Sequence, residues 1–258
     1  MPIVIDACVA QHQGDRKEQQ DRVALLEHSR ENGVALAIVA DGMGGHTGGV
    51  LAAQQVIHTA RTNLEQYSPK SEKPGDLLNA IFNEAHMLIK ASRFINEKDP
   101  HSTAVMMLLQ PGKISWAHCG DSRLYRFYGD RPLFHTIDHS FVEQLVAKGR
   151  ISPAQALVHP NRNVLTTSLG GKSIPKIDFG EASDLRAGDI FMLCSDGLWG
   201  YFNGIEFGSI LATYSAREAS DILITRARSR ARGSGDNISI AVLKLLEAPV
   251  KPDAKKAS

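Results

Sequence analysis

Four aspartates stand where apolar stretches of the chain begin or end. Asp41 follows the apolar run 34–40, and Asp121 follows the run 114–120. Asp196 follows the run 190–195, whereas Asp236 precedes the run 238–243. Short apolar runs bounded by glycine and aspartate are typical of buried strands, so the carboxylates are predicted to lie at strand ends. Buried carboxylates cost free energy unless a cation compensates them, and Mg²⁺ and Mn²⁺ prefer such oxygen ligands.

A site for two metal ions needs one carboxylate that both ions share and further oxygen ligands on each ion. We predict that Asp41 is the shared ligand. The carbonyl of Gly42 is expected to be available as well, because glycine lets the backbone approach closely. Asp196 and Asp236 would complete the ligands of one ion. Asp121 could join Asp196 in holding a further, weaker ion.

Two residues of the N-terminal region fit the same site. Asp21 is expected to act behind the metal ligands or through a bound water. Arg16 offers a planar guanidinium, which binds phosphate with two parallel hydrogen bonds. A metal-activated water beside an arginine that holds phosphate indicates hydrolysis of a phosphoester by direct attack, without a covalent enzyme intermediate.

The elements that must position these residues follow from the hydrophobic pattern. Apolar residues at helical spacing predict helices over 50–66, 76–96, 141–148, 204–214 and 216–232. Shorter runs bounded by turn residues predict two strands within 3–27, and others over 34–40, 104–109, 114–119, 123–127, 133–137, 176–181, 190–194 and 238–243. Closely spaced strands favour antiparallel sheets. We therefore predict an α+β fold with a central antiparallel β-sandwich of two sheets flanked by pairs of α-helices.

Length and composition are those of a globular chain with room for one large domain or two small ones, and a single domain over 1–247 is expected. The chain has 258 residues, of which 43% are hydrophobic and 22% charged. The segment 149–173 carries Pro, Gly and Asn, and is predicted to be an irregular loop beside the active site. The polar tail 248–258 is expected to be disordered.

Charge and hydropathy argue against several classes of partner. A net charge of +1 provides no field that would favour nucleic acid or an anionic membrane. No apolar run approaches the roughly 20 residues that span a bilayer, and the N-terminus lacks the pattern of a signal peptide. Cys8, Cys119 and Cys194 lack metal-ligand spacing and are expected to be reduced thiols, which favours a cytoplasmic location.

Two other kinds of phosphate chemistry fail on spacing. The glycine cluster 42–49 lacks the Gly-Lys-Ser/Thr end of a nucleotide-binding loop, and the segment 171–173 lacks the earlier glycine that such a loop requires. A cysteine-dependent phosphatase needs an arginine after five intervening residues. Arg123 follows Cys119 by only four positions, and Gly200 stands six positions after Cys194. A single Asp-Gly pair is most often a turn, so the argument depends on the joint pattern.

Ordered motifs from residue 14 to residue 243 resemble one protein family. They are Gly14…Arg16…Gln20-Asp21, Val39-Ala40-Asp41-Gly42-Met43-Gly44-Gly45-His46, Ser102-Thr103-Ala104, Ala117-His118-Cys119-Gly120-Asp121-Ser122-Arg123-Leu124-Tyr125, Asp138-His139-Ser140, His159-Pro160…Asn163-Val164-Leu165-Thr166…Leu169-Gly170, Leu193-Cys194-Ser195-Asp196-Gly197-Leu198 and Ser234-Gly235-Asp236-Asn237-Ile238-Ser239. On these motifs the chain resembles the bacterial form of the metal-dependent Ser/Thr protein phosphatases, the PPM (type 2C) family.

The resemblance implies a site with two core Mn²⁺ or Mg²⁺ ions and a possible third ion. By this resemblance Asp41, Gly42, Asp196 and Asp236 serve the core ions, while Asp121 with Asp196 serves the third. Asp21 and Asn237 would support the ligands, Arg16 would hold the substrate phosphate, and 146–173 would be a flap beside the site. The proton donor to the leaving group stays open between a metal-bound water and His46.

The implied substrates are phosphoserine and phosphothreonine on proteins. The leading hypothesis is a monomeric phosphatase that opposes a Ser/Thr kinase. The alternative from another class is a non-catalytic phosphoprotein-binding module on the same fold. Such modules typically lose metal-ligand aspartates, whereas every expected aspartate is present here.

Overall fold

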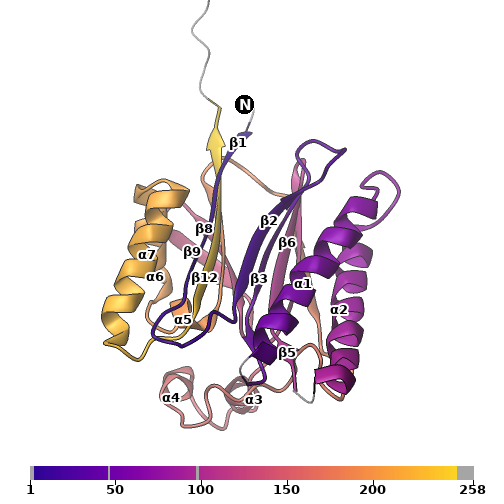
Figure 1. Ribbon diagram of the computed structural model, residues 1–258. Coiled ribbons are helices and arrows are strands. Elements are labelled where there is room, and N and C mark those ends of the chain that lie inside the picture. Colours follow the sequence, from indigo (N-terminus) through magenta and orange to yellow (C-terminus); the bar gives the residue numbers. More distant parts are fainter. Residues whose placement is uncertain (1–2, 46, 97–98, 249–258) are drawn as a thin grey trace, which may run out of the picture.

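Two five-stranded antiparallel sheets form the centre of the structure, a computed structural model that describes residues 3–45, 47–96 and 99–248 (Figure 1). The first sheet has the order β1 (Ile3–His12), β12 (Ile238–Glu247), β11 (Asp189–Cys194), β8 (Arg123–Tyr128) and β9 (Arg131–His135). The second has the order β10 (Asp178–Ala182), β7 (Lys113–Cys119), β6 (Ala104–Gln110), β3 (Ala35–Ala40) and β2 (Arg22–Glu27). A small pair joins β4 (Gly42–Met43) to β5 (His101–Ser102).

The alternation of side chains along a strand explains why the two sheets stack. In β3, Leu36 and Ile38 belong to the hydrophobic core under the helices, whereas Ala37 and Val39 belong to the core between the sheets. Successive residues of a strand point to opposite faces, so a strand that is apolar throughout can be buried on both sides. Phe191 of β11 faces Val39 and its neighbours within the inter-sheet core.

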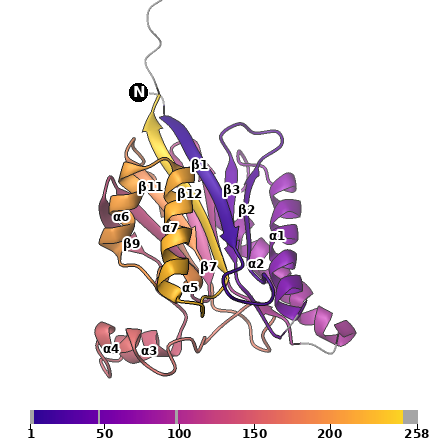
Figure 2. The same ribbon diagram turned by 60° about the vertical axis from the view of Figure 1, so that its left-hand side comes forward.

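Helices cover both outer faces of the sandwich. The helices α1 (Thr47–Gln66) and α2 (Pro74–Asn96) cover the second sheet, and α6 (Gly204–Thr213) and α7 (Ala216–Ala231) cover the first (Figures 1 and 2). The short helices α3 (Phe141–Ala147), α4 (Pro153–Leu157) and α5 (Asp196–Trp199) lie at one end of the sandwich. The predicted α+β sandwich with flanking helix pairs is confirmed. None of the described helices has both the length and the apolar character needed to cross a bilayer.

Several expected element boundaries were wrong. The strand expected over 133–137 is β9 at Arg131–His135, where a register shift between Arg126 and Phe127 of β8 moves the pairing. The strand expected over 176–181 is β10 at Asp178–Ala182, because its partners on β7 begin at His118.

The short helices α4 and α5 and the β4–β5 pair escaped the sequence prediction. The segment 149–173 contains α4, which begins at a capping box in which Ser152 and Gln155 exchange side-chain and backbone hydrogen bonds. In the β4–β5 pair, Gly42 of β4 lies close to the backbone of α1 as well as pairing with Ser102 of β5. A Cβ atom on Gly42 would lie 2.0 Å from the carbonyl oxygen of Gly49. The tail expected to be disordered lies outside the described residues, except for Ala248.

Candidate active site

The four aspartates predicted from the strand ends line one cavity of about 250 Å³. Asp41 follows β3 and Asp121 follows β7, so both come from the second sheet. Asp196 begins α5 directly after β11, and Asp236 lies two residues before β12, so both come from the first sheet. The cavity therefore forms where strand ends of the two stacked sheets meet.

The electrostatics of these carboxylates call for added positive charge. Burial raises the pKa of Asp196 to about 6, and the neighbouring charge of Asp236 adds to this effect. Burial also holds the pKa values of Asp41 and Asp121 well above their usual range, with further contributions from the other carboxylates. Among the described residues that line the cavity, Arg16 is the sole cation. A set of oxygen donors with so little positive charge fits hard divalent cations such as Mn²⁺ and Mg²⁺.

Arg16 lies at the edge of this cavity. Its Nη2 atom contacts Oδ2 of Asp236 at 2.5 Å, and 61% of its side-chain surface is exposed. The guanidinium therefore stands beside a predicted metal ligand and is open to solvent, which suits a group that must reach a phosphate entering from outside.

Asp21 does not line the cavity but lies behind it. It is 1% exposed, and its Oδ2 accepts a hydrogen bond of 2.7 Å from the hydroxyl of Ser195. That hydroxyl in turn accepts the backbone N–H of Ser239 at 3.0 Å. Burial raises the pKa of Asp21 to about 7, and the charges of Asp196 and Asp236 also raise it. Through Ser195, Asp21 thus connects the residue before Asp196 with Ser239 of β12, and its indirect role stays a prediction.

Asn237 organises the loop that carries Arg16. Its Nδ2 donates to the carbonyl oxygens of Gln13 at 2.7 Å and Glu18 at 3.0 Å. Its Oδ1 accepts the backbone N–H of Gln20 at 2.7 Å. One amide side chain therefore satisfies three backbone groups of the loop and holds it against the cavity.

The sequence analysis missed the side chains that hold Asp121. Trp199 donates from Nε1 to the carbonyl oxygen of Asp121 at 2.9 Å. The guanidinium carbon of Arg123 lies 3.6 Å from the centre of the Trp199 ring, and Arg123 binds Asp138 with two hydrogen bonds of 2.7 Å. The motif Asp138-His139-Ser140 was part of the family resemblance, but no spacing rule indicated that Asp138 pairs with Arg123.

His118, His139 and Asp178 form a second cluster, with candidate ligand atoms within 4.8 Å of one another. Nδ1 of His139 accepts the backbone N–H of Gly120 at 3.2 Å, so its Nε2 carries the proton and donates to Asp178 at 3.0 Å. Nε2 of His118 donates to the carbonyl oxygen of Ile137 at 2.9 Å. Because a metal needs a free nitrogen lone pair, His139 in this state acts as a hydrogen-bonding group between Gly120 and β10.

The remaining predicted residues have mixed outcomes. Gly42 lines the cavity beside Asp41, as expected for a residue whose carbonyl could reach a metal. His46 lies outside the described residues. Asn163 and Leu165 of the expected flap line the cavity, so this segment borders the site. Cys119 and Cys194 are fully buried free thiols, and burial raises the pKa of Cys119 to about 12 and that of Cys194 further, which makes them poor nucleophiles.

Comparison with known proteins bears directly on this geometry. The family model described as protein phosphatase 2C matches residues 10–227. The chain belongs to the protein phosphatase 2C family. A putative protein phosphatase 2C-type from Streptococcus pyogenes is 30% identical over 234 residues, which cover 88% of this chain and 92% of that protein.

Solved structures agree with this assignment to the phosphatase 2C family. The serine/threonine phosphatase of S. agalactiae matches with a TM-score of 0.85 and 26% identity, over 95% of this chain and 100% of that one. The catalytic domain of the phosphatase PstP, in complex with two manganese ions, matches with a TM-score of 0.78 and 28% identity, over 95% of this chain and 100% of that one. The predicted family and the predicted activity class, a metal-dependent Ser/Thr protein phosphatase, are confirmed.

Proposed function

We propose that this chain removes phosphate from phosphoserine and phosphothreonine side chains of proteins at the cavity between the two sheets. The observation that carries the proposal is the convergence of Asp41, Asp121, Asp196 and Asp236 on one cavity, with Arg16 at its edge. Support for the proposal comes from residues that are far apart in sequence and yet line one cavity with little positive charge of their own.

Each residue has a distinct part in the proposed reaction. Asp41, the Gly42 carbonyl, Asp196 and Asp236 would hold two Mn²⁺ or Mg²⁺ ions, and Asp121 with Asp196 would hold a third. When bound, such ions lower the pKa of a water molecule and stabilise negative charge on phosphoryl oxygens.

Three further residues would act on the substrate or on the ligands. Arg16 would orient the substrate phosphate through its exposed guanidinium. Asp21 and Asn237 would fix the strands and the loop from which the ligands and Arg16 project.

The cellular setting is also part of the proposal. The substrates would be phosphorylated by a Ser/Thr kinase that this enzyme opposes, and the chain would act as a monomer built from one catalytic domain over 1–247, with 146–173 as its flap. The free thiols of Cys119 and Cys194, which lie buried in the core, are typical of a reducing compartment and support a cytoplasmic location.

The function is tested by hydrolysis of p-nitrophenyl phosphate and of a phosphothreonine peptide. We expect activity with Mn²⁺, loss of activity with EDTA, and loss of activity in Asp41→Asn. The matched control is Asp221→Asn, which removes a carboxylate from an exposed position of α7 and should retain activity. Metal-titration calorimetry should show tight Mn²⁺ binding that Asp41→Asn weakens. Activity that persists in EDTA would rule out the metal-dependent reaction, and an absence of tight Mn²⁺ binding would favour a non-catalytic module.

A further inference from the structure

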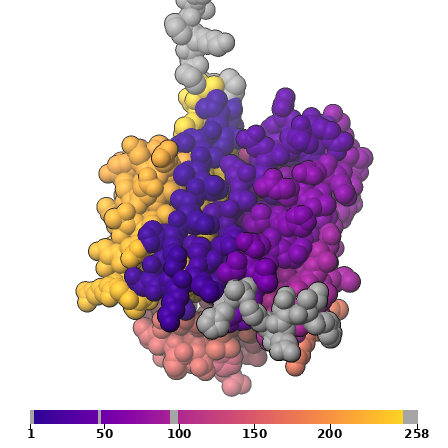
Figure 3. Space-filling view, viewed as in Figure 1, coloured from indigo at the N-terminus to yellow at the C-terminus, as the bar shows by residue number. Residues whose placement is uncertain are grey.

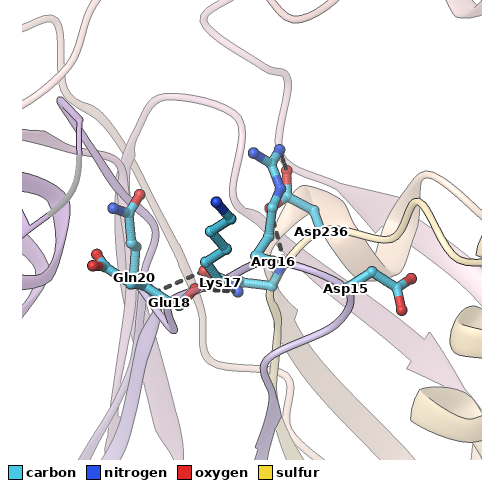
Figure 4. Close-up of a pocket in the computed structure, with 7 residues that line it drawn as sticks. Asp15, Arg16, Lys17, Glu18, Gln20 and Asp236 are labelled. Carbon is cyan, nitrogen blue, oxygen red and sulfur yellow. Dashed lines mark hydrogen bonds and ion pairs between the residues drawn. The ribbon is translucent and has the colours of Figure 1, made fainter.

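A second cavity adjoins the catalytic one. This side cavity has a volume of about 320 Å³ and is lined by Asp15, Arg16, Lys17, Glu18, Gln20, Asp236 and Asn237 (Figure 4). Four of these residues also line the catalytic cavity, namely Arg16, Gln20, Asp236 and Asn237. A peptide whose phosphate lies beside Arg16 therefore has the side cavity directly next to it, within reach of the side chains that flank the phosphorylated residue.

The charged groups that line the side cavity differ in whether they already have a partner. The Asp15 carboxylate already binds Arg228 at 3.1 Å and the backbone N–H of Gly235 at 2.7 Å. Lys17 is exposed, and its ammonium makes no hydrogen bond or ion pair with any described residue. Figure 4 shows Arg16 and Lys17 extended in the same direction from the loop, whereas the carboxylates of Asp15 and Glu18 point away to either side.

The backbone that presents Lys17 is held on both sides. Gln13 donates from Nε2 to the carbonyl oxygen of Arg16 at 2.8 Å, directly before Lys17. The carbonyl oxygen of Glu18, directly after it, accepts from Asn237. The ammonium of Lys17 is thus carried by a fixed loop, which lowers the entropy cost of an ion pair with an incoming group.

A second part of the chain that lines the catalytic cavity has basic residues in its sequence. Asn163 and Leu165 line that cavity, and the exposed Arg162 directly precedes them. Between residues 140 and 176 the sequence has one acidic residue, Glu143, against five basic ones, namely Lys148, Arg150, Arg162, Lys172 and Lys176. In the space-filling view the indigo N-terminal segment adjoins the pink surface of this region (Figure 3). The segment that supplies Asn163 and Leu165 to the cavity is thus rich in basic residues, of which Lys176 already pairs with Asp178 at 2.8 Å.

We infer that the side cavity is a subsite for an acidic side chain next to the phosphorylated residue, and that Lys17 is the group that recognises it. This inference rests on the proposed function, since the phosphorylated residue must occupy the catalytic cavity. The substrate class is then a phosphoserine or phosphothreonine peptide with aspartate or glutamate neighbours. Basic neighbours would meet Lys17 and Arg162 with like charge.

The test compares kcat/KM for two phosphothreonine peptides of equal length, one flanked by Asp and Glu and the other by Lys and Arg. For the wild type we expect the acidic peptide to be favoured by about threefold to tenfold, and we expect high salt to reduce this ratio. Lys17→Met should lower the ratio and Lys17→Glu should lower it further or reverse it. Because both peptides are compared within one variant, a general loss of activity lowers both kcat/KM values equally and leaves their ratio unchanged. The matched control is Arg217→Glu on α7, an exposed residue with the same change of charge.

The outcomes separate the subsite from the function. A wild type that hydrolyses p-nitrophenyl phosphate with Mn²⁺ but does not discriminate between the peptides would overturn the subsite and leave the phosphatase activity intact. A ratio unchanged in both Lys17 variants, or changed equally in Arg217→Glu, would also overturn it. A wild type that hydrolyses none of these compounds would instead overturn the proposed function.

Discussion

Replacement of Asp196 by asparagine should abolish catalysis and yet stabilise the protein in the absence of metal. Asp196 lines the cavity with three other aspartates, and burial, followed by the charge of Asp236, raises its pKa from 3.8 to about 6. Asparagine has nearly the same shape but carries no charge. The substitution therefore removes a repulsive carboxylate, the cost of which bound cations would offset in the proposed site.

The magnitude follows from the difference between the two pKa values. A rise from 3.8 to about 6 corresponds to about 3 kcal/mol of unfavourable free energy for the ionised group in the folded state. The folded protein binds this proton more tightly than the unfolded chain, so the free energy of unfolding falls as pH rises from about 4 to about 6. Below this window the cost is absent, and above it the cost is complete.

The assay is thermal or urea unfolding of both proteins in EDTA at two pH values. At pH values above about 7, Asp196→Asn should be more stable than the wild type by up to about 3 kcal/mol, or by about 6 to 12 °C in Tm for a domain of this size. Near pH 4 the two proteins should unfold with closely similar free energies. Added Mn²⁺ should raise the Tm of the wild type more than that of the variant.

The control replaces a buried aspartate that has a cationic partner. Asp189 is fully buried and accepts hydrogen bonds from Nε of Arg126 at 3.1 Å and from the backbone N–H of Arg186 at 2.9 Å. Asp189→Asn should therefore lower stability at both pH values, since it removes one of the two carboxylates that bind the buried Arg126 guanidinium and leaves only the exposed Asp184 as its counter-charge. The reasoning would be refuted if Asp196→Asn destabilised the metal-free protein at high pH, or if its gain did not depend on pH.

Two further substitutions test the parts that hold the site. Gly14→Ala should lower kcat/KM roughly 100-fold. Gly14 has a φ of +67°, and the added Cβ atom would lie 2.0 Å from the carbonyl oxygen of Asp236, so the loop would have to move. Unaltered kinetics would show that the loop can move without harm to the site. Arg123→Met should lower the free energy of unfolding by roughly 3 to 5 kcal/mol, since it leaves the Asp138 carboxylate, which is 6% exposed, without its partner. Urea unfolding measures this loss. A variant as stable as the wild type would contradict the prediction.

Much of the fold could be predicted because its signals are local. In β3 the side chains alternate between two apolar environments, and this pattern alone marks a strand buried on both faces. The aspartates at strand ends likewise indicated the cavity that Asp41 and Asp196 line. Local signals were weaker where an element is short. The helix α4 of five residues was missed although Ser152 and Gln155 form its capping box.

The side chains that hold the site were not predictable in the same way. Asp138 binds Arg123 across 15 positions, and no periodic pattern distinguishes this pair from other combinations of opposite charge. His118 and His139 stack with ring centres 4.6 Å apart only because the loop after β9 returns to β7. Such contacts depend on how loops return to the sheets, which the composition of the loops does not specify.

The sequence by itself determined the type of fold and indicated the four aspartates that line one cavity. Only the tertiary structure decided that the loop over 13–20 lies against Asp236 and Asn237. The reason is the antiparallel pairing of β1 with β12, in which His12 stands opposite Ile238 and so delivers the loop to residues more than 200 positions away. The same pairing of β1 with β12 sets Lys17 in the side cavity next to the catalytic one. Neither the sequence of 13–20 nor that of 236–237 shows by itself that the two segments meet.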